Sequence, residues 1–383
     1  MKIPYGKQDI VREDIEAVNN VLKSDFLTQG PSIELFEKEF SKYIGCKYSI
    51  ALSNGTAALH LSAIALGVKE GTNVITSPIT FAASANCIRY CDGNVWFADI
   101  DPKTYTLDIN KVEELILSKP KGFFSGIIPV DFAGYSVNLE SYRKLAEKHS
   151  LWIIEDACHS PGGYFYDSNG TKQYCGNGMF ADLSIFSFHP VKHIACGEGG
   201  MITTNNKKLY EKLKLLRTHG ITKDPKLIDT NIGGWFYEMQ VLGYNYRLSD
   251  IQAALGNSQL KRANKGIQRR RKIAAIYNKA FKNKKYIISH SSFIDGHAYH
   301  LYIIQVKERK ELYDFLKTNS IFCQVHYIPV NQLPYYSKMN HQKLTTNNAE
   351  KYYSQCLSIP MYPSIKDAEI NFVINKIDEY YKK

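Results

Sequence analysis

Lys192 stands in a loop whose composition could make its amine reactive. The segment 187–200 reads Ser-Phe-His-Pro-Val-Lys-His-Ile-Ala-Cys-Gly-Glu-Gly-Gly, which is largely apolar and rich in small residues. Burial and a neighbouring positive charge lower the pKa of a lysine, and the free amine is then available as a nucleophile. Gly199 and Gly200 would let backbone pass close to a ligand. A lysine that simply faces solvent is the alternative when this segment is taken alone.

Two pairs of side chains could suggest a metal site. His189 and His193 lie four residues apart, but Pro190 between them disfavours the helix that such a pair requires. Cys87 and Cys91 are also spaced for one helix face and lack a second pair of ligands. We therefore expect no metal. The chain has eight cysteines and no CxxC pair, which favours reduced thiols.

A second candidate is an apolar segment that ends in two acids. Residues 151–155 predict a strand, and the alternation of side chains places Glu155 and Asp156 on opposite sides of it. A carboxylate at the carboxyl end of a strand suits catalysis. It could equally cap the helix that follows.

The third candidate is the segment 53–59, Ser-Asn-Gly-Thr-Ala-Ala-Leu, between an expected strand and an expected helix. Gly55 allows a tight turn, and the free N–H groups of Gly55, Thr56 and Ala57 would point out of the helix N-terminus. Together with the helix dipole they would form a phosphate site. An ordinary helix start capped by Ser53 or Asn54 explains the same residues.

Together these three candidates match what a pyridoxal 5′-phosphate site requires. Lys192 would hold the cofactor aldehyde as a Schiff base, and Asp156 would keep the pyridine nitrogen protonated. The helix start and Ser187 would hold the phosphate. Phe81 could stack on the ring, although a plain core position is the alternative for it.

The elements that must position these residues alternate between strands and helices. The predicted strands are 48–52, 73–76, 95–99, 126–130, 151–155, 183–188 and 200–203, and predicted helices between them include 56–66, 82–90 and 139–149. This alternation predicts an α/β fold with a mostly parallel central sheet and helices on both faces. Ligands bind beyond the carboxyl ends of such strands, where the three candidates lie.

The length of 383 residues predicts more than one domain. A helix is expected from 249 to 278, followed by strands at 298–306 and 322–327 and helices at 308–319 and 367–381. We expect a large cofactor-binding domain over residues 1–255 and a smaller α+β domain over 256–383. The N-terminal segment could pack with the small domain.

Composition excludes several classes of protein. The chain is 44% hydrophobic and 22% charged, which is typical of a folded globular protein and not of a disordered one. It has no apolar stretch of the ~18 residues that a membrane span needs and no signal-peptide pattern. We therefore expect a cytoplasmic protein without a membrane partner.

The net charge of +11 raises the question of nucleic acid. The densest basic run, 269–272 (Arg-Arg-Arg-Lys), falls in an expected helix, and a solvated helix face is the favoured interpretation. No nucleic-acid-binding motif accompanies it, so no nucleic-acid partner is expected. Some of the positive charge could instead serve small phosphorylated ligands.

The chain resembles the DegT/DnrJ/EryC1/StrS sugar aminotransferases, which are pyridoxal-phosphate enzymes of fold type I. The resemblance runs from about residue 28 to 361. The segments that carry it are Asn-Gly-Thr-Ala-Ala-Leu at 54–59, Glu-Asp-Ala-Cys-His at 155–159, Ser-Phe at 187–188 with Lys192, Gly-Glu-Gly-Gly at 197–200, Arg-Thr-His-Gly at 217–220 and Gly-Tyr-Asn-Tyr-Arg at 243–247.

This resemblance implies roles for individual residues. Lys192 would be the Schiff-base lysine and Asp156 the partner of the pyridine nitrogen. His159 would contact the ring hydroxyl, where many members have glutamine. Ser187 and the amides of 55–57 would hold the phosphate. Asn245 would reach the phosphate of the neighbouring subunit's cofactor, which implies a homodimer with shared active sites.

Within the family, the segments 189–192, 324–327 and 25–30 are most similar to the pseudaminic-acid pathway branch. That branch transfers the amine of L-glutamate to C4 of UDP-2-acetamido-2,6-dideoxy-β-L-arabino-hex-4-ulose. The positions that this likeness implies for substrate binding are Tyr5, Asp25, Phe26, Leu27, Thr28, Gln324, Val325, His326 and Tyr327. The segment 164–174 looks like an insertion, and no role is implied for it.

Other functions remain open from the sequence. The same chemistry could act on a dTDP- or GDP-linked sugar, or on a C3 ketone. A non-catalytic regulator with this fold is disfavoured by the intact pair of Lys192 and Asp156. A related branch that removes a hydroxyl carries histidine at the lysine position, and the register here places Lys192 there, with His193 after it.

Overall fold

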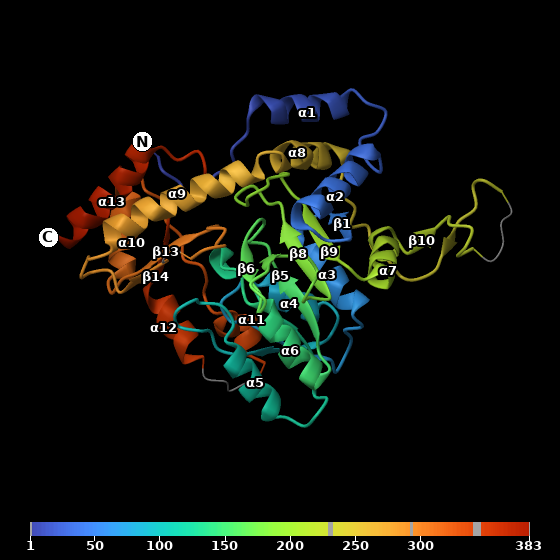
Figure 1. The fold of residues 1–383 in the computed structure, drawn as a ribbon, viewed down its shortest axis with the longest axis horizontal. Helices are drawn as coiled ribbons and strands as arrows, with labels where there is room; N and C mark the ends of the chain where they lie inside the picture. Colours follow the sequence, from blue (N-terminus) through green and yellow to red (C-terminus); the bar gives the residue numbers. More distant parts are fainter. Residues whose placement is uncertain (1, 229–232, 292–293, 340–345, 383) are drawn as a thin grey trace.

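The computed structural model describes residues 2–228, 233–291, 294–339 and 346–382. A seven-stranded sheet in the order β1-β9-β8-β5-β4-β2-β3 forms the centre of its larger part (Figure 1). The strands are β1 (Tyr48–Leu52), β2 (Asn73–Thr76), β3 (Asn94–Phe97), β4 (Phe124–Ile128), β5 (Trp152–Asp156), β8 (Leu183–Ser187) and β9 (Gly200–Thr204).

Six of these seven strands run in one direction. β9 is antiparallel to both of its neighbours, β1 and β8, and every other neighbouring pair is parallel. The carboxyl ends of the six strands therefore lie at one edge of the sheet, together with the start of β9. The predicted mostly parallel α/β fold is confirmed, and all three candidate site segments begin at that edge.

Helices cover both faces of this sheet. They are α2 (Pro31–Ile44), α3 (Gly55–Ala65), α4 (Ala83–Arg89), α5 (Ile109–Leu117), α6 (Leu139–His149), α7 (Lys207–Arg217) and α8 (Asp250–Leu260). α1 (Arg12–Leu22) packs on the outside of α8 (Figure 1). The consecutive residues Ile153 and Ile154 of β5 join different core clusters, the first with α5 and α6 and the second with α3 and α7. Strands buried on both faces explain the continuous apolar runs in the sequence.

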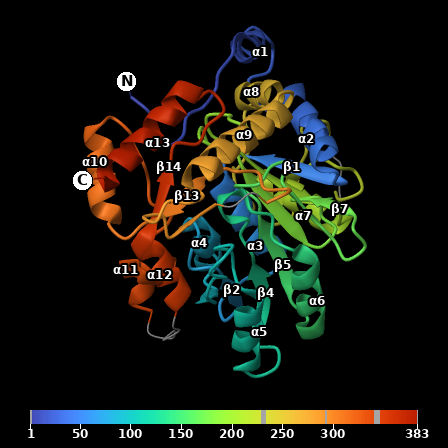
Figure 2. The ribbon, with the colours of Figure 1, turned by 60° about the vertical axis from the view of Figure 1, so that its left-hand side comes forward.

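A second core is built from the C-terminal part of the chain (Figure 2). It contains a three-stranded antiparallel sheet of β12 (Ser289–His290), β13 (Tyr302–Gln305) and β14 (Cys356–Ile359). Its helices are α9 (Ala263–Phe281), α10 (Arg309–Thr318) and α13 (Asp367–Tyr381). The same part of the chain also forms α11 (Pro334–Ser337) and α12 (Asn347–Gln355), whose buried residues join other core clusters. Ile3 is fully buried in this core, so the N-terminal segment packs with the C-terminal part.

Two hairpins extend from the larger part. The segment 164–174 forms β6 (Tyr164–Tyr166) and β7 (Lys172–Tyr174), which pair antiparallel. β10 (Ile221–Thr222) pairs with β11 (Glu238–Met239) and projects away from the sheet (Figure 1). No helix in the described ranges is long and apolar enough to cross a membrane.

Two predicted elements are wrong. The helix expected over 249–278 is divided, because Arg262 leaves the helical conformation (φ −114°, ψ 9°) where its guanidinium binds Asp9 and Asp14. The strand expected over 322–327 is absent from the assigned strands: Phe322 N–H donates to Ile3 O, and a single bridge joins Gln324 to Ser358. The backbone on either side of Ile321 is thus hydrogen-bonded to Ile3 of the N-terminal segment, and it is not available to pair continuously with β14.

The interpretation of the basic run as a solvated helix face is wrong for Arg270. Arg270 is 2% exposed, and its Nη1 donates to the carbonyl oxygens of Tyr299, His300 and Met361 at 3.0–3.1 Å. Burial lowers the pKa of the guanidinium to about 10. Arg270 therefore ties α9 to the segment before β13 and the segment after β14.

Replacing Arg270 should reveal this structural role. Arg270→Met keeps an unbranched stem but leaves three buried carbonyls without this donor, so we expect a loss of at least about 3 kcal/mol in the free energy of unfolding. Lys272→Met, in the same run but exposed, is the matched control and should change stability by less than about 0.5 kcal/mol. Urea denaturation of both variants checks this. Equal stabilities would contradict the assignment.

Candidate active site

A cavity of about 670 Å³ opens at the carboxyl edge of the central sheet. It is lined from three directions: by the start of α3, by the ends of β5 and β8, and by the loop before β9. The predicted site residues that line it are Tyr5, Gly55, Thr56, Ala57, Phe81, Asp156, His159, Ser187, Lys192, His326 and Tyr327. Segments far apart in the sequence thus converge on one space.

Lys192 lies in the loop between β8 and β9 and is half-buried at the cavity wall. Its backbone N–H donates to His189 O at 2.9 Å, which closes a turn in the loop. Burial lowers the pKa of the Lys192 amine below its usual value, and the charges of Cys158 and Asp156 partly oppose this. The neutral amine is therefore more accessible than in an exposed lysine.

Asp156 is the last residue of β5 and is 5% exposed. Its Oδ2 accepts from Ser84 Oγ at 2.6 Å, and its Oδ1 accepts from Cys158 N–H at 3.2 Å. Ser84 is also 2.7 Å from Thr80 Oγ1. The carboxylate is thus oriented by two neutral donors, and its remaining lone pairs are available to a ligand in the cavity.

The start of α3 forms a cradle of backbone beside Ser187. Asn54 caps the helix, since its Oδ1 accepts from Ala57 N–H at 2.8 Å, while the N–H groups of Gly55 and Thr56 belong to the first turn and have no intrahelical acceptor. A Cβ on Gly55 would lie 3.0 Å from the Ser187 Cβ. A larger residue at position 55 would therefore crowd Ser187. The free N–H groups at this helix start suit the binding of an anion.

His159 is a buried, neutral imidazole at the cavity. Its Nδ1 accepts from Ala133 N–H at 3.3 Å, so the hydrogen is on Nε2, which lies 3.4 Å from the Tyr327 hydroxyl. The ring of His300 packs on it at a centroid distance of 4.2 Å. Burial, followed by the charge of Lys192, holds the pKa of His159 well below its usual range.

Aromatic residues also line the cavity. Phe81 precedes α4 and is 62% exposed, whereas a phenylalanine is usually buried. The centroid of its ring is 6.3 Å from that of Tyr327. Tyr5 and His326 lie together on the same wall, with ring centroids 5.4 Å apart. An exposed phenyl ring at a cavity is available to stack on a planar ligand.

Seven of the predicted site residues do not line this cavity. They are Asp25, Phe26, Leu27, Thr28, Asn245, Gln324 and Val325. Thr28 and Asn245 form isolated bridges with Ser249 and Thr218, and Phe26 and Leu27 are 53% and 48% exposed. Within one chain the structure does not bring these residues to Lys192.

Several cavity residues were not predicted as site residues. Ser84, Cys158 and His300 contact the predicted residues, and His60 lies 3.1 Å from the Tyr246 hydroxyl. Cys158 and Tyr246 belong to the segments 155–159 and 243–247 that carry the family resemblance, and this was the available signal for them. For Ser84 and His300 no local pattern exists, because their partners lie far away in the sequence.

The residues around the cavity fit pyridoxal 5′-phosphate. The cradle at Gly55 and Ser187 suits the phosphate, and the open carboxylate of Asp156 suits a protonated ring nitrogen. Lys192 lines the same space, with an amine whose pKa is lowered. These are the contacts that the phosphate, ring nitrogen and aldehyde of this cofactor require.

Comparisons with known proteins agree with this chemistry. Residues 8–378 match the DegT/DnrJ/EryC1/StrS aminotransferase family. The chain is 37% identical to UDP-4-amino-4,6-dideoxy-N-acetyl-beta-L-altrosamine transaminase from Campylobacter jejuni, over 97% of this chain and 95% of that protein. It is 36% identical to the spore coat polysaccharide biosynthesis protein SpsC from Bacillus subtilis, over 99% and 97% of the two chains.

The fold is similar to that of a solved sugar-pathway enzyme. The structure of Helicobacter pylori PseC, an aminotransferase involved in the biosynthesis of pseudoaminic acid, superimposes with a TM-score of 0.89 and 30% identity over 100% of both chains. Aminotransferases of this family use pyridoxal 5′-phosphate. The chain therefore belongs to the DegT/DnrJ/EryC1/StrS family and is a pyridoxal-phosphate-dependent sugar aminotransferase.

Proposed function

We propose that this aminotransferase moves the amino group of L-glutamate to C4 of a UDP-linked 4-keto-6-deoxy-N-acetylhexosamine. The proposed acceptor is UDP-2-acetamido-2,6-dideoxy-β-L-arabino-hex-4-ulose, on the route to pseudaminic acid. The observation that carries the proposal is the placement of Lys192 at the cavity wall with Asp156 and the α3 cradle. The likeness to the Campylobacter and Helicobacter enzymes over almost the whole chain supports the choice of sugar.

The reaction would proceed in two halves on one site. Glutamate gives up its amino group and leaves as 2-oxoglutarate, and the ketosugar then takes up that amino group at C4. The bound cofactor supplies an aldehyde that carries the amine and a ring that accepts electrons from the substrate carbon. Lys192 holds the cofactor between turnovers and, as a free amine, moves a proton to and from the reacting carbon.

The other cavity residues would position the cofactor. Asp156, oriented by Ser84, keeps the ring nitrogen protonated. Gly55, Thr56, Ala57 and Ser187 hold the phosphate. His159 donates from Nε2 to the ring hydroxyl, and Phe81 stacks on the ring face. Tyr5, His326 and Tyr327 also line the cavity, and there they would contact the sugar nucleotide.

We also propose a homodimer in which each chain completes the site of the other. Asn245 and the segment 25–28 do not line the cavity of their own chain, yet the sequence resemblance gives them roles in the site. Apolar side chains are exposed in the segment 25–28, on the β10–β11 hairpin and just after it: Phe26 (53%), Leu27 (48%), Trp235 (73%), Met239 (62%) and Leu242 (79%). Exposed apolar surface of this kind is typical of an interface.

A second candidate substrate is another nucleotide-linked ketosugar. The similarity to the Bacillus spore coat polysaccharide protein is as extensive as the similarity to the Campylobacter enzyme. The chemistry at Lys192 would be the same for both. Only the loops and the partner subunit would distinguish the sugars.

Product analysis tests the substrate. Incubation of the purified protein with glutamate and a panel of UDP-, dTDP- and GDP-linked 4-ketosugars should give an aminosugar from the UDP-linked substrate, with one 2-oxoglutarate formed per amine transferred. The Lys192→Ala protein serves as the blank. If no UDP-linked 4-ketosugar were aminated, the proposed substrate would be wrong, whereas amination of a dTDP-linked sugar alone would support the second candidate.

Removal of the Lys192 amine tests the role of that residue. Lys192→Ala should lose the visible absorption band of the lysine–cofactor linkage, and turnover should fall at least about a hundredfold. Borohydride reduction of the native protein followed by peptide mass mapping should place the pyridoxyl group on Lys192. Lys208→Ala, an exposed lysine on α7, should keep both properties. Attachment at any other lysine would refute the assignment.

Removal of the Ser84 hydroxyl tests the orientation of Asp156. Ser84→Ala deletes a hydrogen bond to a charged group, worth about 1.5–3 kcal/mol, so cofactor affinity should fall roughly ten- to a hundredfold. Ser62→Ala removes another buried serine hydroxyl, which donates to Ala58 O within α3, and should leave affinity within about twofold. Titration of the cofactor-free proteins by fluorescence measures both. Equal affinities would exclude this role for Ser84.

A further inference from the structure

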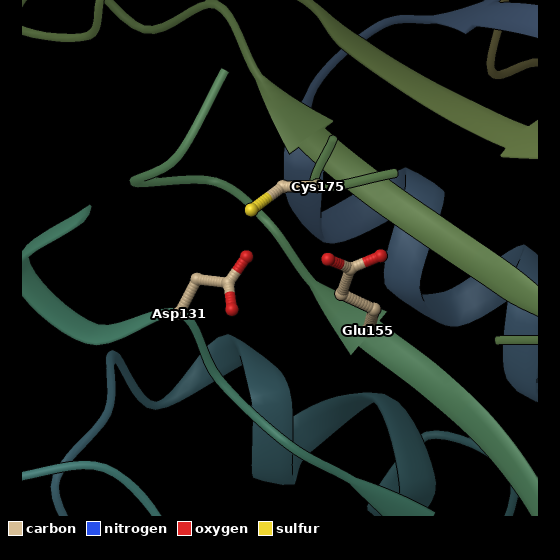
Figure 3. A group of neighbouring side chains, drawn as sticks. All are labelled: Asp131, Glu155 and Cys175. Carbon is tan, nitrogen blue, oxygen red and sulfur yellow. The ribbon is translucent and has the colours of Figure 1, made fainter. Parts of the chain in front are cut away.

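Asp131 and Glu155 form a buried pair of carboxyl groups on the side of β5 opposite to Asp156. Asp131 is 0% and Glu155 1% exposed. Figure 3 shows the two side chains facing each other, with Cys175 beside them. One oxygen of each carboxyl and the sulfur of Cys175 all lie within 4.8 Å of one another. These groups take no part in the proposed reaction.

One oxygen of Glu155 has no hydrogen-bond partner among the described residues. Oε2 accepts from Gly176 N–H at 2.9 Å and from Ser184 Oγ at 2.6 Å, whereas Oε1 is fully buried and unpaired. A carboxylate oxygen left in this state is costly in a protein interior. A proton on Oε1 would turn it into a donor, and Figure 3 shows one oxygen of Glu155 directed at Asp131.

Asp131 is placed to accept a hydrogen bond from that group. Its Oδ1 already accepts from Val137 N–H at 3.0 Å, and its Oδ2 accepts from Ser160 Oγ at 2.5 Å. Each oxygen of an ionised carboxylate has two lone pairs, so capacity for one more hydrogen bond remains. A charged Asp131 that accepts from a neutral Glu155 satisfies every oxygen of the pair.

The surroundings disfavour a second negative charge. Neither carboxyl makes an ion pair with a lysine, arginine or histidine of the described ranges. The titratable side chains that interact electrostatically with the pair are themselves acidic: Cys175, Cys158 and Tyr142. Burial raises the pKa of Asp131 to about 6, and burial together with Asp131 raises the pKa of Glu155 well above its usual range.

A bound metal is a poorer explanation of the same cluster. The thiol of Cys175 donates to Ser136 Oγ at 3.0 Å, and three protein ligands fall short of the four that a closed zinc site uses. A proton shared by the two carboxyl groups requires no ligands beyond their own oxygens.

The pair is linked to the residues at the cofactor cavity. Asp131 N–H donates to Asp156 O at 3.0 Å, and Asp156 N–H donates to Pro129 O at 2.9 Å. Ser160, which directly follows His159, donates to the Asp131 carboxylate. Asp131 therefore holds both ends of the segment 156–160, which carries Asp156 and His159.

We propose that Asp131 and Glu155 share one proton, with Glu155 as the neutral donor, and that this hydrogen bond positions the segment 156–160 for the cofactor. The role of these two residues as positioning residues rests on the proposed use of Asp156 and His159, while the shared proton itself does not. Both carboxyls hold protons more tightly in the folded chain than in the unfolded chain. Stability is therefore lost as the pH rises through the folded-state value of Glu155.

The variants Glu155→Gln and Glu155→Leu separate this role from simple packing. The Gln amide can still donate to Asp131 and accept from Gly176 and Ser184, so we expect it to retain cofactor affinity within about threefold of the native protein. Leu cannot donate and leaves Ser184 without its acceptor, and it should lose at least about tenfold in affinity. Asp182→Asn, which alters a half-buried carboxylate bound to Arg143 just before β8, is the matched control for loss of an acid.

Infrared spectroscopy of the cofactor-free protein detects the proton independently of activity. The native protein and Asp182→Asn should show the carbonyl stretch of a protonated carboxylic acid at about pH 8, and Glu155→Gln should lack it. As the pH rises above about 5, close to the pKa of a glutamate in the unfolded chain, the unfolding temperature of the native protein and of Asp182→Asn should fall more steeply than that of Glu155→Gln.

Three results would overturn the shared proton. The first is the absence of the protonated-acid band in the native protein. The second is a decrease of the unfolding temperature with rising pH that is equally steep in the native protein and in Glu155→Gln. The third is one equivalent of tightly bound metal in the purified protein. If the band were present but Glu155→Leu bound the cofactor as tightly as the native protein, the positioning role would be wrong. An inactive native protein with the band intact would instead count against the proposed function.

Discussion

The structure depends on a buried carboxylate that accepts hydrogen bonds only from neutral groups. Asp156 is 5% exposed, and it accepts hydrogen bonds from a serine hydroxyl and a backbone N–H. No lysine, arginine or histidine within the described ranges forms an ion pair with it. A buried anion of this kind costs free energy unless a cation pairs with it. In the proposed function that cation is the protonated ring nitrogen of the cofactor.

The groups around Asp156 avoid competing for that position. His159 and His300 are buried near Lys192 and His326 is half-buried there, and burial, followed by neighbouring positive charges, lowers the pKa of each ring, that of His326 to about 3. They therefore stay neutral at physiological pH, and His159 and His326 form hydrogen bonds without carrying a charge. Lys192 remains the side chain beside Asp156 that can change between a cation and a free amine, which suits a lysine that must both bind an aldehyde and move a proton.

Much of the fold could be predicted from local sequence patterns. β1, β2, α6 and α13 have the predicted bounds, because apolar runs and helical periodicity are properties of short segments. The break at Arg262 could not be predicted, since its cause is a pair of acids about 250 residues earlier. Arg270 was misinterpreted for the same reason: its acceptors belong to residues 29, 30 and 91 positions away.

In the site, too, local features could be predicted and contacts between distant residues could not. Lys192, Asp156 and the α3 start each follow a strand, so their meeting at one edge of a parallel sheet could be predicted. The hydroxyl that orients Asp156 could not, because Ser84 lies 72 residues earlier in an ordinary small-residue helix. The acid pair of Asp131 and Glu155 was equally hidden, since Glu155 was predictable only as a residue facing away from Asp156.

A crystal structure of the protein with pyridoxal 5′-phosphate tests the central claim most directly, because it shows all three contacts at once. The predicted result is continuous density from Lys192 Nζ to the cofactor, a ring nitrogen within about 3 Å of the Asp156 carboxylate, and the phosphate at the N–H groups of Gly55 and Thr56 beside Ser187. A cofactor bound elsewhere, or one in this cavity with its ring nitrogen turned away from Asp156, would contradict it.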